Sequence, residues 1–224
     1  MCATIFLMKE QYFTPESIHA LSSQWLAEYA RPKRLKSQPF DIKRAALLVL
    51  DMQKYFLNPD SHAYIPSATA ILPGINQAIS FFRTNQRPII ATKHVNSKNN
   101  AGMMAAWWSE IMTENHQLIG LHPDLDLKEE EIIDKNQYDA FYQSELAALL
   151  DASQIDQLVI GGVMTHLCCE TTARAAFVQG YEVYFMVDGT ATYNQKFHKA
   201  TLQNLAHGFA VLISVEDLVE GLKI

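Results

Sequence analysis

Cysteine is scarce in this chain: its 224 residues include three, and two of them, Cys168 and Cys169, are adjacent. Three cysteines cannot form the disulfide framework of a small secreted protein. No apolar run reaches the ~18 residues that a membrane span needs. The N-terminus has neither the basic region nor the cleavage pattern of a secretory signal. We therefore expect a soluble, cytoplasmic protein that does not bind membranes.

Basic residues are also in the minority. Eighteen Lys and Arg against 24 Asp and Glu give a net charge of −6, which argues against a nucleic-acid partner. Apolar residues make up 49% of the chain and aromatic residues 10%, which excludes a disordered protein. The length permits one large domain or two small ones.

The first forty residues differ in pattern from the rest. Thr14 and Pro15 are typical of a helix start, and apolar residues then recur at helical spacing up to Tyr29. The segment 31–39 is basic, contains two prolines and is interpreted as a linker. We predict a helical N-terminal arm, residues 1–40, that packs on the main body or on a neighbouring subunit. Residues 41–224 form the main domain in this interpretation.

From residue 44 onward, short apolar runs alternate with stretches of helical periodicity. The predicted strands are 45–50, 87–92, 131–134, 157–163, 181–187 and 209–215. The predicted helices are 73–85, 103–113, 143–150, 168–179 and 195–206. This pattern predicts a three-layer α/β fold whose open, doubly wound, Rossmann-like sheet has about six parallel strands with helices on both faces. The chain is too short for an eight-stranded α/β barrel.

Polar side chains follow several of the predicted strands. Asp51, Lys135 and the segment leading to Cys168 come directly after strands, and His94 follows another by two residues. In an open parallel sheet, ligands bind beyond the carboxyl ends of the strands. These residues are therefore the first candidates for a shared site.

Cys168, Asp51 and Lys135 form a chemically coherent set. A catalytic cysteine must ionise, and Cys168 stands at the predicted start of a helix, where an anion is stabilised. A carboxylate could accept the thiol proton and later protonate a leaving amine, while a lysine would stabilise negative charge. Such a set suits attack on a carbonyl or nitrile carbon. A buried structural cysteine is an equally good interpretation of Cys168 alone.

Three segments carry a resemblance: LLVLDMQKYFL, IIDKNQYDAFYQSEL and GGVMTHLCCETTARAAFVQGYEVYFMVDGTAT. In order and spacing they resemble the isochorismatase-like cysteine hydrolases, which include nicotinamidase, N-carbamoylsarcosine amidase, ureidoacrylate amidohydrolase and isochorismatase. The resemblance implies a six-stranded parallel sheet, a small-molecule substrate and a homodimer or homotetramer. It also implies that Asp51 is the acid/base, Lys135 its lysine partner and Cys168 the nucleophile.

The resemblance further implies an oxyanion hole made by the backbone N–H groups of Met164 and Cys168, next to a cis peptide bond between Val163 and Met164. Residues 61–64 are expected at the mouth of the substrate pocket. The residues predicted to contact substrate are His94, Trp108, Tyr138, Phe141, Thr165 and His166.

The sequence departs from nicotinamidases at a metal motif. Those enzymes carry D-x-H after the second strand, where this chain has His94-Val95-Asn96. We therefore expect neither a metal of that type nor another cofactor. DMQ-x-YFL, the paired tryptophans at 107 and 108 and His166 look closer to isochorismatases, which lack the cysteine.

The favoured hypothesis is a cysteine hydrolase that cleaves a C–N bond of a small amide or carbamoyl compound through a Cys168 thioester. One alternative is vinyl-ether hydrolysis in which Asp51 supplies the proton without a covalent intermediate. Another is a binding protein that kept the fold and lost turnover.

Overall fold

The computed structural model describes residues 9–30 and 39–222. Its strands are β1 (Ala45–Leu50), β2 (Ile89–His94), β3 (Ile132–Lys135), β4 (Gln157–Val163), β5 (Glu182–Ala191) and β6 (Ala210–Ile213). Its α-helices are α1 (Ile18–Tyr29), α2 (Lys54–Leu57), α3 (Leu72–Thr84), α4 (Met104–Trp107), α5 (Leu146–Ala152), α6 (Glu170–Val178), α7 (Gln195–Gly208) and α8 (Val215–Glu220). Short 3₁₀ turns are η1 (Ile42–Arg44), η2 (Ala68–Ile71) and η3 (Glu129–Glu131), and η4 (Thr165–Cys169) is a π-helical turn.

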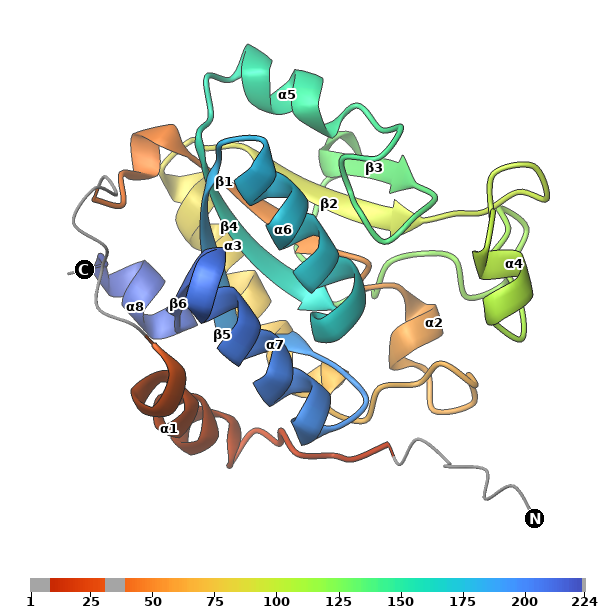
Figure 1. Cartoon of the computed structure of the whole chain (residues 1–224), viewed down its shortest axis with the longest axis horizontal. Helices are drawn as coiled ribbons and strands as arrows, with labels where there is room; N and C mark the ends of the chain where they lie inside the picture. Colours follow the sequence, from red (N-terminus) through yellow and green to blue (C-terminus); the bar gives the residue numbers. More distant parts are fainter. Residues whose placement is uncertain (1–8, 31–38, 223–224) are drawn as a thin grey trace.

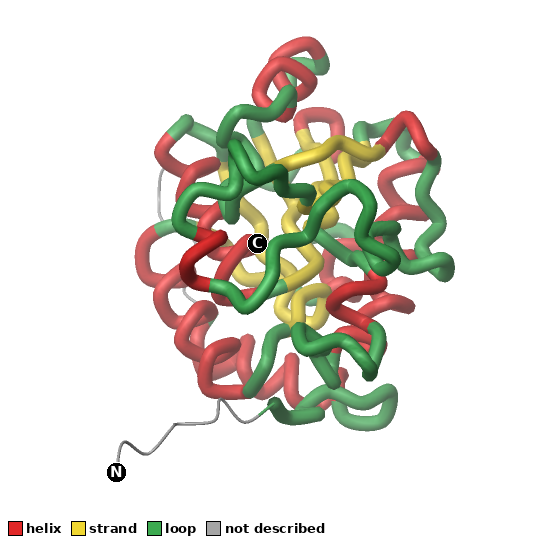
Figure 2. The backbone as a smooth tube through the Cα atoms, turned by 90° about the vertical axis from the view of Figure 1, so that its right-hand side faces the viewer, coloured by secondary structure: helices red, strands yellow, loops and turns green. Residues whose placement is uncertain are grey.

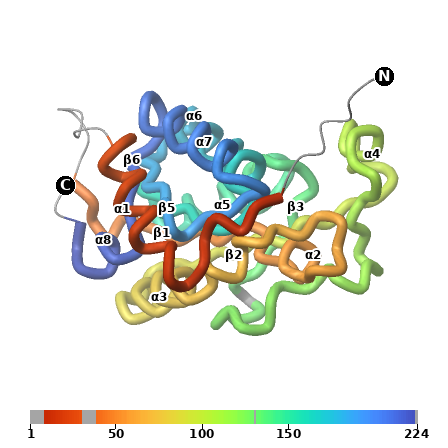
Figure 3. Tube along the Cα trace, turned by 90° about the horizontal axis from the view of Figure 1, so that it is seen from below, coloured from red at the N-terminus to blue at the C-terminus, as the bar shows by residue number. Residues whose placement is uncertain are grey.

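The strands form one six-stranded sheet in the order β3-β2-β1-β4-β5-β6, and every neighbouring pair is parallel. Helices α3 and α8 cover one face, and α6 and α7 cover the other (Figure 3). The predicted doubly wound α/β fold is therefore confirmed. None of the helices in the described ranges is long and apolar enough to span a membrane.

The order reverses between β1 and β4. Successive strands run outward from β1 to β3 on one side, and from β4 to β6 on the other. This switch point leaves a crevice beyond the carboxyl ends of the two central strands. In Figure 1 these ends point toward α2 and α4, and Figure 2 looks onto this end, where loops gather over the strands.

The central strands are apolar on both faces because helices cover both. All residues of β1 and of β4 are buried, as expected for strands of a covered parallel sheet. One predicted helix was wrong in extent: of 103–113 only Met104–Trp107 is helical. Beyond it, the backbone N–H of Asn96 donates to the Met112 carbonyl at 2.6 Å, so pairing with the chain after β2 outweighs the helical periodicity.

The described part of the N-terminal arm packs on the main body. Helix α1 lies against β5, β6 and α7. Trp25 and Phe13 are fully buried, and their rings lie 5.1 Å apart. The Tyr12 hydroxyl forms a hydrogen bond of 2.9 Å with Nδ1 of the buried His198 of α7. The predicted linker falls mostly on residues outside the described ranges.

The arm is expected to stabilise the whole fold. Trp25→Ala removes a fully buried indole, and we expect it to lower the free energy of unfolding by about 3–5 kcal/mol, measured by urea denaturation. Gln24→Ala, on the exposed side of the same helix, should change it by less than about 0.5 kcal/mol. A Trp25→Ala loss no larger than that of the control would contradict this view of the arm.

Candidate active site

Three candidate residues converge at the switch point. Asp51 follows β1, Lys135 ends β3 and Cys168 lies in η4, directly after β4. The central strands approach so closely there that a Cβ on Gly162 would lie 2.1 Å from the Leu50 carbonyl oxygen. Only glycine fits at this contact, and its φ of +110° also favours glycine. The close approach brings the residues after β1 and β4 together.

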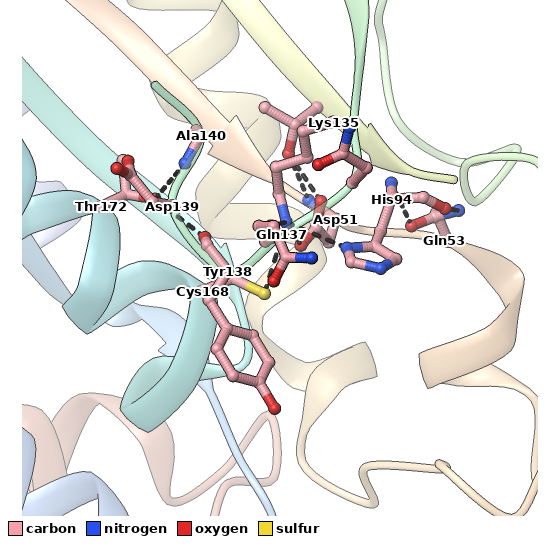
Figure 4. Close-up of polar contacts among 12 residues, drawn as sticks. Asp51, Gln53, His94, Lys135, Gln137, Tyr138, Asp139, Ala140, Cys168 and Thr172 are labelled. Atoms are coloured by element: carbon pink, nitrogen blue, oxygen red, sulfur yellow. Dashed lines mark hydrogen bonds and ion pairs between the residues drawn. The ribbon is translucent and has the colours of Figure 1, made fainter. Parts of the chain in front are cut away.

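The ammonium group of Lys135 is the centre of the site (Figure 4). Its Nζ lies 2.8 Å from Oδ2 of Asp51 and 3.5 Å from Sγ of Cys168. It also donates to the Gln137 carbonyl at 2.8 Å and faces Nδ1 of His94 at 3.3 Å. The ammonium therefore touches both the candidate base and the candidate nucleophile.

The ion pair between Lys135 and Asp51 is fully buried, with neither side chain exposed. Burial by itself lowers the pKa of Lys135, but the Asp51 charge and the Cys168 sulfur outweigh it, so the pKa is raised overall. The other Asp51 oxygen, Oδ1, accepts the Thr92 hydroxyl proton at 2.6 Å. Both carboxylate oxygens thus have fixed partners, and the lysine stays charged.

The Cys168 thiol is protonated in this arrangement. Burial raises its pKa to about 12, and the Asp51 carboxylate adds to the rise, while Lys135 opposes it. The predicted effect of the following helix does not outweigh this burial. A thiol of this kind becomes a nucleophile only when a base removes its proton during attack. Asp51 is the carboxylate placed to do so.

His94 is neutral, and its partners assign its tautomer. Burial, followed by the Lys135 charge, lowers its pKa to about 4. Because an ammonium can only donate, Nδ1 of His94 accepts from Lys135. Nε2 therefore carries the proton and donates to Oδ1 of Asn96 at 2.9 Å. The Asn96 amide is held in turn by its donation to the Asn136 carbonyl at 2.9 Å.

This geometry does not fit a metal of the nicotinamidase type. Both ring nitrogens of His94 are engaged, and Asn96 replaces the histidine of the D-x-H motif. Within the described ranges, no group of three or more His, Cys, Asp and Glu is arranged to hold a metal ion.

Gln53 holds the ends of the strands in place. Its Nε2 donates to the His94 carbonyl at 3.1 Å and to the Ile119 carbonyl at 2.7 Å. Its Oε1 accepts from the His94 N–H at 2.9 Å. The glutamine of the DMQ segment thus fixes the carboxyl end of β2 beside Asp51.

A small, mostly apolar cavity of about 70 Å³ opens above Cys168. This volume holds roughly five water molecules, so the cavity suits a small molecule. The lining residues are Tyr55, Phe56, His62, Ala63, His94, Asn96, Met104, Trp108, Glu110, Ile111, Met112, Tyr138, Met164, Leu167, Cys168 and Tyr193. His62 and Ala63 belong to the loop expected at the pocket mouth.

Comparison with known proteins shows the family of this chain. The family model described as the isochorismatase domain matches residues 45–217. The chain belongs to the isochorismatase family. It is 38% identical to Nicotinamidase 3 of Arabidopsis thaliana over 80% of this chain and 89% of that protein. It is 27% identical to the isochorismatase family protein YwoC of Bacillus subtilis (strain 168), over 82% of this chain and 96% of that protein.

Among solved structures, a cysteine hydrolase from Pseudomonas syringae pv. phaseolicola 1448A matches with a TM-score of 0.79 and 23% identity, over 85% of this chain and 97% of that chain. This likeness shows the shared fold. The resemblance found in the sequence is confirmed, and the chain is a hydrolase of the isochorismatase family with relatives of the amidohydrolase type.

Two residues predicted to contact substrate form a pair on the wall of this isochorismatase-family cavity. Nε1 of Trp108 donates to the Tyr138 hydroxyl oxygen at 2.8 Å. Figure 4 shows the Tyr138 hydroxyl pointing away from the ion pair. Because an indole N–H can only donate, Tyr138 keeps its own hydroxyl proton for another acceptor. Thr172 of α6 holds this segment by donating to the Tyr138 carbonyl at 3.2 Å.

Three other predicted contact residues lie outside the lining of the cavity. Phe141 stacks on Tyr181, with ring centroids 5.6 Å apart. His166 stacks on Phe197, and its Nδ1 lies 2.5 Å from the Thr192 hydroxyl. Thr165 is fully buried, and its hydroxyl has no hydrogen-bond partner in the described part of the chain.

The residues of the predicted oxyanion hole, Met164 and Cys168, both line the cavity. The peptide bond between Val163 and Met164 is cis, as the resemblance implied. Sequence reasoning missed Tyr55 and Glu110, which lie 55 residues apart in the chain and meet at the cavity. No local motif marks that contact.

Asp51→Asn is expected to lower the pKa of the Cys168 thiol. Loss of the carboxylate removes a charge that raises the thiol pKa, while Lys135 continues to lower it. We expect the pH profile of iodoacetamide alkylation of Cys168 to move to lower pH by roughly 0.5–1 pH unit, measured by tandem mass spectrometry that resolves Cys168 from Cys169. Asp134→Asn, an exposed carboxylate beside Lys135, is the control. A pH profile that moves no further in Asp51→Asn than in this control would contradict the assigned geometry.

Proposed function

We propose that the chain hydrolyses the C–N bond of a small amide or carbamoyl compound through a thioester on Cys168. The observation that carries the proposal is the shared Lys135 ammonium, 2.8 Å from the Asp51 carboxylate and 3.5 Å from the Cys168 sulfur. A base, a nucleophile and a fixed cation are thus in contact beside the cavity.

In the first half of the reaction, Asp51 accepts the thiol proton as Cys168 Sγ bonds to the substrate carbonyl carbon. The carbonyl oxygen becomes an oxyanion, which the backbone N–H groups of Met164 and Cys168 stabilise in this proposal. Protonated Asp51 then gives its proton to the leaving nitrogen. The C–N bond breaks, the amine or ammonia departs and a thioester remains.

In the second half, water attacks the thioester carbon while Asp51 takes one of its protons. The C–S bond breaks, and the proton on Asp51 returns to Sγ. The products are a carboxylic acid and the restored thiol. Asp51 thus serves alternately as base and acid, and the enzyme needs no other proton carrier.

Nicotinamide is the first substrate to test. The relative with 38% identity is named a nicotinamidase, and the cavity is small, with aromatic walls that include Trp108 and Tyr138. The free hydroxyl proton of Tyr138 would suit a ring nitrogen that accepts a hydrogen bond.

Cys168→Ala is expected to abolish amide hydrolysis. Loss of the nucleophile should lower kcat by at least about 1,000-fold, measured as ammonia release from nicotinamide and a panel of small amides. Cys169→Ala removes the neighbouring buried thiol and should retain activity within about threefold, because that sulfur does not line the cavity. Undiminished turnover in Cys168→Ala would refute the covalent mechanism.

The same variants separate the rival reactions. Vinyl-ether hydrolysis of isochorismate would continue in Cys168→Ala and stop in Asp51→Asn. A binding protein would release no product from either substrate class in the unmodified chain.

Tyr138→Phe tests the placement of the ring nitrogen. We expect KM for nicotinamide to rise about three- to tenfold, the usual effect of losing one hydrogen bond, with kcat little changed. Benzamide lacks the ring nitrogen, so its KM should not move. Tyr142→Phe, at an exposed tyrosine, is the matched control. Equal effects on both substrates would refute this contact.

A further inference from the structure

The cavity has a second polar cluster, distant in sequence from the reacting residues. The Glu110 Oε1 atom accepts the Tyr55 hydroxyl proton at 2.9 Å and lies 3.1 Å from Nδ1 of His62. His116 Nε2 approaches the same oxygen at 3.8 Å. The Glu110 and His62 side chains are 45% and 43% exposed, whereas Cys168 is 6% exposed. The cluster therefore lies at the mouth of the cavity and the thiol at its floor.

The cluster holds the carboxylate in one orientation. Burial, and then the hydrogen bond to Glu110, raise the pKa of Tyr55, so its hydroxyl remains a donor. The hydrogen bond from Tyr55 and the shortest approaches of His62 and His116 are all made to Oε1 of Glu110. Oε2 is the oxygen left to accept a hydrogen bond from a ligand.

Glu110 also sets the charge of the cavity. All the residues that line the cavity lie within the described ranges. Among them Glu110 is the one acidic residue, and none is Lys or Arg. The Lys135 ammonium lies beneath the lining and is engaged with Asp51. The arm residue Lys9 donates to the His62 carbonyl and lies over the Tyr193 ring, outside the lining. The mouth therefore favours hydrogen-bond donors and cations over anions.

We propose that Glu110 is a specificity-determining residue whose carboxylate binds an N–H donor, best a protonated amine, at the end of the substrate remote from the scissile bond. The ligand's identity as an amide substrate rests on the proposed function. A substrate with a carboxylate at that end is disfavoured, because it would face Glu110 without a cation among the lining residues.

Binding to Cys168→Ala tests the charge preference without turnover. The probes are benzamide and its 3- and 4-substituted aminomethyl and carboxylate derivatives, with dissociation constants measured by calorimetry. We expect the better aminomethyl isomer to bind about tenfold more tightly than the better carboxylate isomer, as one charge-assisted hydrogen bond would give. In Cys168→Ala/Glu110→Gln the ratio should fall to near one, with benzamide affinity unchanged. Glu114→Gln, at an exposed acid outside the lining, should keep the ratio.

Three results would overturn the subsite: a preference that persists in Cys168→Ala/Glu110→Gln, equal binding of both charged probes to Cys168→Ala with Glu110 intact, or no binding of any probe. Ammonia release by the unmodified chain is measured in parallel on the same amides. If the Glu110-dependent preference holds while no amide is hydrolysed, the subsite stands and the proposed hydrolysis fails.

Discussion

The buried ion pair between Lys135 and Asp51 is the constraint on which the site depends. An isolated charge in a protein interior is strongly disfavoured, so each of these groups requires the other. Their strands are not neighbours, because β2 lies between β3 and β1. The lysine side chain therefore passes His94, whose ring must stay neutral to face an ammonium at 3.3 Å. Burial keeps this histidine neutral, and the Lys135 charge adds to the effect. With both ring nitrogens of His94 engaged, the site does not fit a metal of the nicotinamidase type.

The sheet supplies the precision that this pair requires. Asp51 has a φ of +52°, a left-handed conformation that is uncommon outside glycine but tolerated by aspartate. It turns the chain sharply at the end of β1, where Gly162 of β4 permits close approach. Gln53 then ties this turn to the end of β2. Residues other than the three that converge thus fix the position of Asp51 relative to Cys168.

The fold and the convergence of Asp51, Lys135 and Cys168 were predictable, whereas the cavity walls were only partly so. Asp51, Lys135 and Cys168 are found by a local rule, because parallel strands end at one edge. The walls come from loops, where closeness in sequence does not determine which way a side chain points. Phe141 and His166 lie near Lys135 and Cys168 in the sequence, yet their rings pack on other rings. The sequence did not indicate Glu110, because its partners Tyr55 and His62 lie about fifty residues away in the chain. Such contacts depend on tertiary packing, which periodicity does not encode.

In the proposed mechanism, the shared ammonium also accounts for how a thiol with a raised pKa would react. Before proton transfer, the negative charge next to Lys135 is on Asp51; afterwards it is on Cys168. Lys135 contacts both atoms, so it compensates one negative charge in either state. The transfer moves charge a few ångströms within a fixed environment, and little reorganisation is needed. A thiolate maintained permanently beside a charged Asp51 would instead place two anions against one cation. The protonated resting thiol is therefore the arrangement expected when acid, base and nucleophile share a single buried lysine.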